Sequence, residues 1–392
     1  MFIKTQTIGF DVTISDIIKT EFNLSDELMY LNHAAVAPWP ERTKQAVCDF
    51  ASENAHFGSK NYLKWVEHES ELRSMLATLI NAPSSNDIAL LKSTSEALSV
   101  VAHGLDWNAG DNVVISDQEF PSNRIVWESL SSYGVELNQV DLSSAKSPEV
   151  ALINACDDHT RLLAISSVQY ATGLRMDLPM LGEFCRQHQI FFCIDAIQSI
   201  GALQFDVQQY KADFVMADGH KWMLGPEGLA LFYCRAELRE QVKLHQYGWH
   251  MVEHAHDFTR TDWEPAKSAR RFECGSPNML GVHALRASIS LLLEVGMSSV
   301  EQNLLERTEF VFNEINRSDN LQLVSQTEAG RFAGISTFSH NSADPELLYR
   351  WLMSKGVMCA PRGGGIRFSP HFYTPLSTIE SAVHLADNYP AD

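Results

Sequence analysis

Short apolar runs alternate with longer amphipathic segments between residues 88 and 217. The short runs have the length of strands, and the segments between them carry apolar residues at helical spacing. This alternation predicts a mostly parallel sheet covered by helices on both faces. We expect strands at residues 88–91, 112–116, 135–140, 162–168, 191–194 and 212–217. We expect one helix that begins at Ala97 and three more at residues 124–133, 147–155 and 178–188.

The flanking segments extend this α/β pattern. An apolar run at 228–234 follows the previous strand too closely for a helical crossover, so we expect it to run antiparallel to that strand. Residues 41–79 predict a long helix with a break near Gly58 and Ser59. Residues 278–293 predict an amphipathic helix that leads to a smaller part of the chain. In that part we expect helices at 300–315 and 345–354 and strands at 334–339 and 356–359.

The length of 392 residues exceeds that of a usual single domain. With the patterns above, it predicts an N-terminal arm (1–27, helical over 10–27) that joins the small domain, a large domain (28–282) and a small α+β C-terminal domain (283–392). The apolar content of 45% is ample for a large core.

The net charge of −19 disfavours nucleic acid and anionic membrane surfaces as partners. The seven cysteines are scattered and form no CxxC pair, which is typical of reduced thiols. The N-terminus lacks the apolar core of a signal peptide, and no apolar run has the length of a membrane span. We therefore expect a cytoplasmic protein.

Two polar residues follow neighbouring strands of the expected sheet. Asp195 ends one strand, and Lys221 follows the next one, 26 residues later (221 − 195). The carboxyl ends of parallel strands are the usual location of ligand groups in such sheets. A lysine that forms a Schiff base and a carboxylate that pairs with a pyridinium nitrogen are what pyridoxal 5'-phosphate (PLP) requires of a protein. The pattern therefore predicts a PLP site.

Two motifs carry a resemblance to a known family: Asp195-Ala196-Ile197-Gln198 and Asp218-Gly219-His220-Lys221-Trp222. They resemble the class V aminotransferases, which include cysteine desulfurases, selenocysteine lyases, kynureninase-like enzymes and isopenicillin-N-epimerase-like proteins. The similarity extends from about residue 31 to about residue 373. It implies the fold-type I aminotransferase architecture, PLP as the cofactor, and a homodimer with shared active sites.

The resemblance also implies roles for individual residues. Lys221 would form the Schiff base and then act as the base at Cα, while Asp195 would keep the ring nitrogen protonated. Phe120 would stack on the pyridine ring, and Gln198 would bond its phenolic oxygen. Tyr170 stands near that oxygen, where the family often has Asn. The phosphate would be held by Thr94, Ser95, His220 and the partner's Ser276.

Asp218 also departs from the family pattern, since it stands where the desulfurases have a phosphate-binding Ser. An acid is a poor partner for a phosphate dianion, so we expect this carboxylate to point elsewhere. On the substrate side, Arg367 would bind the α-carboxylate of an amino acid through two parallel donors, with Arg362 as the rival. Asn32 and His33 would line the same side.

The reaction type is open at the level of sequence. A lyase of the cysteine/selenocysteine type, which cleaves C–S or C–Se bonds, is our first choice. An aminotransferase or epimerase comes next, and a non-catalytic PLP-binding module is a third hypothesis. A desulfurase needs a thiolate on a mobile loop, but Cys359 lies in an apolar strand only eight residues before Arg367 (367 − 359), so we expect a core residue.

The segment 245–256 contains four histidines, two of them, His250 and His254, at helical i, i+4 spacing. No HExxH motif is present. We therefore expect a solvated or interface segment here and no metal site.

Overall fold

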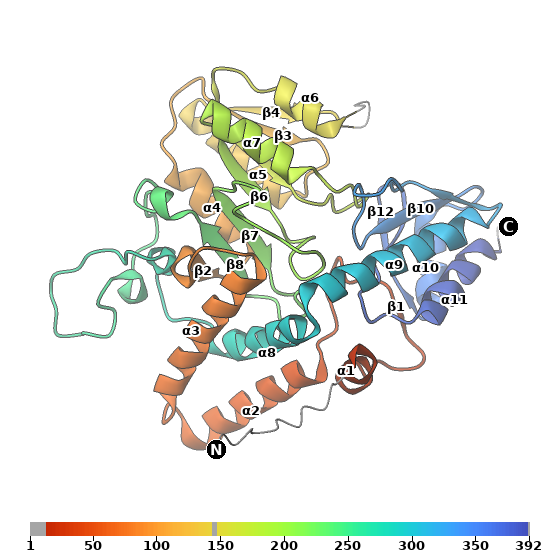
Figure 1. Ribbon diagram of the computed structural model, residues 1–392, viewed down its shortest axis with the longest axis horizontal. Helices are drawn as coiled ribbons and strands as arrows, with labels where there is room; N and C mark the ends of the chain where they lie inside the picture. Colours follow the sequence, from red (N-terminus) through yellow and green to blue (C-terminus); the bar gives the residue numbers. More distant parts are fainter. Residues whose placement is uncertain (1–12, 143–146, 391–392) are drawn as a thin grey trace, which may run out of the picture.

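The computed structural model describes residues 13–142 and 147–390, and every structural statement below refers to these residues. A large domain and a smaller one lie side by side, and α9 (Met297–Asn316) begins between them and runs along the smaller one (Figure 1). The predicted N-terminal arm begins outside the described residues, and its described part contains α1 (Ile14–Glu21).

A seven-stranded sheet forms the centre of the large domain. Its spatial order is β2 (Ile88–Leu91), β8 (Ala230–Cys234), β7 (Phe214–Asp218), β6 (Phe191–Asp195), β5 (Thr160–Ser166), β3 (Asn112–Ser116) and β4 (Glu136–Val140). Only β8 runs antiparallel to its neighbours. The predicted mostly parallel sheet and the reversed strand after the lysine loop are both confirmed.

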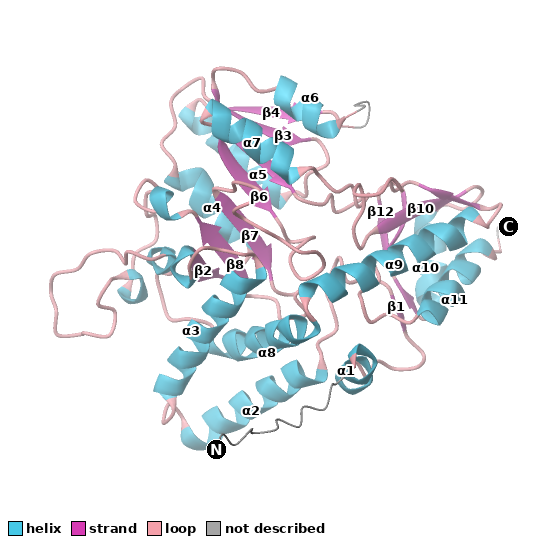
Figure 2. Cartoon of the chain, in the orientation of Figure 1, coloured by secondary structure: helices cyan, strands magenta, loops and turns pink. Residues whose placement is uncertain are grey.

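Helices cover both faces of this sheet (Figure 2). On one face, Phe214 and Met216 belong to a core shared with α4 (Thr94–Gly104) and with Trp127 of α5 (Ser122–Glu128). On the other face, alternate residues such as Val215 join a second core. That core includes residues of α3 (Tyr62–Leu79), α6 (Pro148–Asn154), α7 (Leu178–His188) and α8 (Met279–Val295). Both faces of each central strand are buried, as expected for continuous apolar runs.

The predicted long helix at 41–79 is two helices, as its break suggested. α2 (Glu41–Phe57) ends at Gly58, which has a φ of +58°, and α3 begins at Tyr62. Both pack against α8. Although α8 leads to the small domain as predicted, its own packing partners are in the large domain. The change of partners falls within α9, C-terminal to the predicted boundary at 282/283: Val300 and Leu304 join the large-domain core, and Val311 and Ile315 join the small-domain core.

The small domain is α+β, as predicted. Its four-stranded antiparallel sheet has the order β12 (Ala360–Arg362), β13 (Gly365–Phe368), β10 (Ser336–His340) and β9 (Leu321–Leu323). α9, α10 (Pro345–Ser354) and α11 (Leu376–Asp387) share a core with one face of the sheet. The N-terminal segment joins this domain through β1 (Met29–Tyr30), which pairs with β11 (Val357–Met358), and through Phe22, which stacks on Tyr373.

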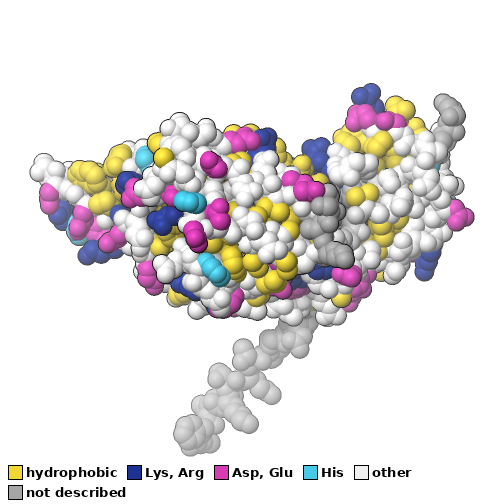
Figure 3. All heavy atoms as spheres, turned by 90° about the horizontal axis from the view of Figure 1, so that it is seen from above, with side chains coloured by type: hydrophobic (Ala, Val, Ile, Leu, Met, Phe, Trp, Pro, Cys, Tyr) yellow, Lys and Arg dark blue, Asp and Glu magenta, His cyan; other side chains and the backbone are white. Residues whose placement is uncertain are grey.

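A long irregular segment follows β8 and projects from the left end of the molecule in Figure 1. It exposes three aromatic side chains, Tyr247, Phe258 and Trp263. Hydrophobic side chains are visible at that end of the surface in Figure 3. The short 3-10 helices of the chain are η1 (Ser85–Asp87), η2 (Ser129–Tyr133), η3 (Ala236–Leu238), η4 (Trp249–Met251) and η5 (Ala269–Phe272).

Among the described residues, no single helix has the length and apolarity to cross a membrane. Only α8 and α9 taken together pass such a test, and they meet at an angle of 84°.

Candidate functional site

Lys221 and Asp195 lie at the ends of two adjacent parallel strands. Asp195 is the last residue of β6 and pairs in register with Met216 of β7, and Lys221 lies in the turn that follows β7. Asp195 is buried, and its Oδ1 accepts a hydrogen bond from the backbone N–H of Ile197 at 3.0 Å. No cation bonds this carboxylate among the residues described.

Burial shifts both groups toward their neutral forms. It raises the pKa of Asp195, against the effect of the Ile197 N–H and of Lys221. It lowers the pKa of Lys221, and Arg367 lowers it further, whereas Asp195 and Asp218 raise it. A lysine that loses its proton more readily is a better nucleophile toward an aldehyde. A buried carboxylate with one open oxygen suits a pyridinium N–H.

Two aromatic rings lie beside the lysine. The Nζ of Lys221 is 5.8 Å from the centroid of the Phe120 ring. Phe120 in turn contacts the Tyr170 ring edge-to-face, with the centroids 5.2 Å apart. Phe120 is 42% exposed in the single chain, so its ring is available to stack on a flat ligand next to Lys221.

A buried carboxylate that the sequence analysis missed, Glu119, positions these rings. It accepts hydrogen bonds from the backbone and hydroxyl of Ser166, from Asn123 (2.7 Å) and from Gln169 (3.0 Å). Ser166 and Gln169 lie just before Tyr170 in the chain, and Asn123 lies just after Phe120. Glu119 therefore connects the two loops that carry the rings. Burial raises the pKa of Glu119. Its only signal in the sequence is its place beside Phe120.

Arg367 reaches the site from the small domain. Its Nη1 donates to the carbonyl of Tyr170 at 2.7 Å, and its Nε is buried without a protein partner among the described residues. Burial, and then Arg362, lowers the pKa of Arg367 to about 10, so it remains charged at neutral pH. The edge formed by Nε and Nη2 is therefore open for a carboxylate.

The N-terminus of α4 lies next to the lysine loop. The backbone N–H of Thr94 donates to Oδ2 of Asp218 at 3.1 Å, and that of Asp218 donates to Oγ1 of Thr94 at 3.1 Å. Ser93 caps the helix by accepting from the N–H of Glu96. In the described part of the chain, the N–H of Ser95 has no protein partner, and the Ser95 hydroxyl bonds Ser122 at 2.9 Å.

This arrangement fits a phosphate group. A helix of this length presents free N–H groups and a positive dipole end to an anion. His220 lies at the same place, with its Nδ1 3.5 Å from Oδ1 of Asp218. We expected Asp218 to point elsewhere. Instead, its carboxylate caps α4 and takes the N–H of Thr94, which leaves Ser95 and His220 as the free donors.

The comparison with known proteins decides the family. The sequence profile described as "Aminotransferase class-V" matches residues 29–369. The chain belongs to this family. The resemblance seen in the two motifs is confirmed, and with it a PLP-dependent enzyme of fold type I.

Curated relatives cover 70% to 93% of the chain. A "Probable cysteine desulfurase" of Methanothermobacter thermautotrophicus is 28% identical over 93% of this chain and 95% of its own length. An "Uncharacterized aminotransferase YcbU" of Bacillus subtilis is 28% identical, with 88% and 89% covered. A cysteine desulfurase of Salmonella dublin is 30% identical over 70% of this chain and 69% of its own length.

Solved structures agree in fold. The apo structure of a cysteine desulfurase from Thermococcus onnurineus NA1 superposes with a TM-score of 0.85 at 22% identity, covering 95% of this chain and 97% of that one. The cystine C–S lyase C-DES, in complex with cysteine persulfide, gives a TM-score of 0.85 at 21% identity, with 92% and 98% covered.

Two residues expected at the class V site are bonded to neighbouring protein groups. Gln198 donates to the carbonyl of Ala34 (3.1 Å) and accepts from Nε1 of the buried Trp222 (2.8 Å), which leaves its second amide N–H for a phenolic oxygen. His33 is fully buried between the carbonyl of Ser369 (2.8 Å) and the hydroxyl of Tyr373 (2.7 Å). Burial lowers the pKa of His33 to about 4. These bonds give His33 a packing role here.

Asn32 lies closer to Arg367 in the fold. It forms a parallel bridge with Ser369, just beyond the strand that carries Arg367, and its buried Oδ1 has no protein partner in the described part of the chain. This free acceptor is suited to a polar ligand group.

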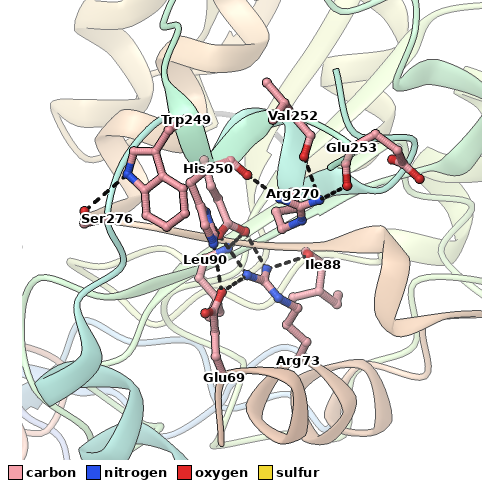
Figure 4. Close-up of polar contacts among 11 residues, drawn as sticks. Glu69, Arg73, Ile88, Leu90, Trp249, His250, Val252, Glu253, Arg270 and Ser276 are labelled. Carbon is pink, nitrogen blue, oxygen red and sulfur yellow. Dashed lines mark hydrogen bonds and ion pairs between the residues drawn. The ribbon is translucent and has the colours of Figure 1, made fainter. Parts of the chain in front are cut away.

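Ser276 lies on the irregular segment that follows β8. It is exposed, and its hydroxyl accepts a hydrogen bond from Nε1 of Trp249 at 3.4 Å (Figure 4). Within the described ranges, it forms no hydrogen bond with Lys221, Asp195 or Arg367. Such a position is compatible with a role in another subunit.

A second buried polar cluster, also missed in the sequence, holds the segment that carries Trp249 and Ser276 (Figure 4). Arg73 of α3 forms ion pairs with Glu69 and Glu273, and His250 lies 3.9 and 3.7 Å from these two carboxylates. Arg270 donates to the carbonyls of His250, Val252 (2.9 Å) and Glu253 (3.3 Å).

Glu69, His250 and Glu273 have the spacing of metal ligands. Both carboxylates are already bonded by the guanidinium of Arg73, however, and this charge disfavours a second cation. His254 does not belong to the cluster. The cluster therefore fixes the irregular segment to α3 and β2, where Glu273 also accepts the N–H of Leu90 at 2.8 Å.

Proposed function

We propose that the chain is a PLP-dependent lyase that cleaves the C–S bond of a cysteine-type amino acid. The observation that carries this proposal is the position of Lys221, buried beside Asp195, Phe120 and Arg367 at the edge of a class V sheet. Relatives named as cysteine desulfurases and the fold shared with a cystine C–S lyase support cleavage at sulfur.

Each residue of the site has its own role in the proposed cleavage of the C–S bond. PLP, when bound, supplies the electron sink that makes the Cα–H and Cβ–S bonds of the substrate labile. Lys221 would attach the cofactor and, once the substrate amine has displaced it, would take the proton from Cα. Asp195 would hold the proton on the ring nitrogen, and Arg367 would orient the substrate through its carboxylate. The Cβ–S bond breaks with both electrons on sulfur, and the released 2-aminoacrylate hydrolyses to pyruvate and ammonium.

The fate of the sulfur follows from Cys359. This thiol is 2% exposed in the small-domain core, and burial raises its pKa to about 12. It therefore lacks both the exposure and the thiolate character of an attacking nucleophile. We infer that the sulfur leaving group is released from the site rather than transferred to Cys359.

We propose further that the enzyme is a homodimer with shared active sites, in which the partner's Ser276 contacts the phosphate. The exposed position of Ser276 on a rigidly held segment supports this. So do the exposed aromatic side chains of that segment, together with Phe57 (60% exposed) and Leu63 (81% exposed) at the α2–α3 turn. Apolar exposure of this kind is typical of an interface, and two-fold dimers are the commonest symmetric assembly.

The seven cysteines are all free, which supports the prediction of a reducing, cytoplasmic compartment. The absence of nucleic-acid and membrane partners stays a prediction from the net charge.

A panel of amino acids with the purified holoenzyme tests the function, and Lys221→Ala serves as the inactive control. We expect pyruvate, ammonium and a released sulfur product from cysteine or its S-linked derivatives. A keto acid without sulfur release would indicate an aminotransferase instead, and loss of optical activity alone would indicate an epimerase. No turnover on any amino acid would leave a PLP-binding module and overturn the proposal.

A further inference from the structure

The hairpin that carries Arg367 has a two-residue loop. β12 and β13 are joined by Gly363 and Gly364, with φ of +61° and +78°. Positive φ at both central residues is the type I′ arrangement, which glycine adopts without strain and which fixes the register of the strands. In that register Arg362 lies opposite Gly365, and Ala360 lies opposite Arg367.

This register places Arg362 and Arg367 on the same face. Residues directly opposite one another share a face, as do residues two apart along a strand. Arg362 is thus a diagonal neighbour of Arg367, at a backbone distance of roughly 7–8 Å. The intervening Ile366 and the following Phe368 point the other way, into the small-domain core.

The shared face is turned toward the site. Thr337, opposite Arg367 on the other side, donates from its hydroxyl to the carbonyl of Ala171 at 2.6 Å. Arg367 donates to the neighbouring carbonyl of Tyr170. A Cβ on Gly363 would come within 3.1 Å of the Ala171 carbonyl. Arg362 therefore lies on the face that contacts the loop of Tyr170, whose ring packs against Phe120 beside Lys221.

The positive charges on this face exceed what an α-carboxylate balances. Asp195 opposes Lys221, and the open Nε–Nη2 edge of Arg367 binds one carboxylate completely. Arg362 is exposed, and its one hydrogen bond to a described residue goes to the carbonyl of Pro361, at 2.9 Å. Across residues 13–142 and 147–390 no carboxylate pairs with it.

We propose that Arg362 binds a second carboxylate at the far end of the substrate side chain, so that the site selects a thio amino acid whose sulfur substituent ends in a carboxylate. The proposal rests on the proposed C–S lyase function. Arg362 is then a specificity residue. Because Arg367 already binds the α-carboxylate, the guanidinium of Arg362 adds affinity only for a substrate with a second anionic group.

Ligands without an amino group separate binding from turnover. Adipate and hexanoate have the same chain length and differ in the second carboxylate. Isothermal titration of the holoenzyme with each acid measures the preference. We expect adipate to bind at least about tenfold tighter, an effect in the range of a charged hydrogen bond. Arg362→Gln is expected to abolish the preference and leave hexanoate affinity unchanged.

The matched control is Arg350→Gln, an exposed arginine on α10 that pairs with Glu346 on the same helix. It is expected to leave both affinities unchanged. Equal affinity of the wild type for the two acids would overturn the proposal, as would equal loss of both acids in Arg362→Gln, which would place Arg362 at the α-carboxylate. A preserved preference for adipate in an enzyme that releases no sulfur would refute the lyase function alone and leave this subsite standing.

Discussion

Thr94 and Asp218 are held together by two reciprocal hydrogen bonds of 3.1 Å, each from the backbone N–H of one residue to the side chain of the other. The pair joins the first turn of α4 to the end of β7. It thereby sets the expected phosphate site, at Ser95, beside the lysine loop that begins at Gly219. It also places a negative charge where the cofactor's phosphate would approach.

Removing that charge should tighten phosphate binding. Asp218→Asn keeps an acceptor for the Thr94 N–H but loses the anion, so we expect the Kd of the apoenzyme for PLP to fall several-fold at low salt. The Kd for pyridoxal, which has no phosphate, should change little. Absorbance titrations with both compounds measure the difference. Asp344→Asn, at the N-cap of α10 in the small domain, is the control. Equal changes for the two compounds would refute the electrostatic explanation.

The sequence predicted the layers of the fold because local patterns encode them. The helix at 178–188 and the strand at 112–116 match α7 and β3 to the residue, and the reversal of β8 followed from the short connection after Lys221. The Thr94–Asp218 pair, the contacts of Glu119 with Ser166 and Gln169, and the Arg73–Glu273 pair were missed. Their members are 124, 47 to 50 and 200 residues apart in the chain.

The candidate site was predictable only in part for the same reason. Asp195 ends a strand and Lys221 follows the next one, so the apolar runs in the sequence predict that both lie at the same edge of the sheet. Gln198 and His33 belong to motifs, but a motif does not say which neighbours compete for their polar atoms. Trp222 and Tyr373 do so here, and both are aromatic core residues whose periodicity indicates only burial.

Lys221 should attach PLP at a pH well below the ordinary pKa of lysine, because burial and Arg367 lower its pKa. Borohydride trapping of the apoenzyme with saturating PLP, followed by peptide mapping, should place the label on Lys221. The trapping rate should rise with pH and level off below pH 10. A label on another lysine would reject the assignment.

Two variants should move this pH profile in opposite directions. Arg367→Gln removes a cation that lowers the pKa of Lys221, so its midpoint should shift to higher pH. Asp195→Asn removes the anion that raises the pKa, so its midpoint should shift to lower pH. Arg350→Gln should have no effect. Shifts of the same sign in both variants would contradict the arrangement of charges around the lysine.

Cys359→Ala should leave turnover close to that of the wild type. The thiol is buried in the small-domain core, so its loss creates a small cavity and should lower the free energy of unfolding by about 1 kcal/mol. Urea denaturation and the rate of pyruvate formation measure the two effects. Loss of turnover with PLP still bound and stability unchanged would restore a desulfurase mechanism through this cysteine.

If the proposed dimer forms through the irregular segment that follows β8, negative charges introduced there should separate the subunits. The double variant Phe258→Asp and Trp263→Asp should shift the protein from dimer to monomer in sedimentation experiments and weaken PLP binding. Leu347→Asp, at an exposed apolar position on α10, is the control and should remain dimeric. A wild-type monomer with full affinity for PLP would refute the shared site.

Arg367→Lys tests the carboxylate clamp. The guanidinium bonds Tyr170 through Nη1 and leaves two parallel donors, Nε and Nη2, for the substrate, whereas an ammonium cannot serve both partners with this geometry. Attachment of PLP to Lys221 should persist, because Arg367 forms no hydrogen bond with α4, the helix that we propose to bind phosphate. kcat/KM should fall by about tenfold or more for every amino acid substrate.

The range of substrates affected distinguishes Arg367 from Arg362. Arg362→Lys should reduce kcat/KM chiefly for substrates with a second carboxylate, since its partner lies beyond the sulfur. Steady-state kinetics with cystine and S-methylcysteine, one with and one without that carboxylate, make the comparison. If Arg362→Lys impairs both substrates strongly and Arg367→Lys neither, then Arg362 holds the α-carboxylate and the open edge of Arg367 serves another ligand.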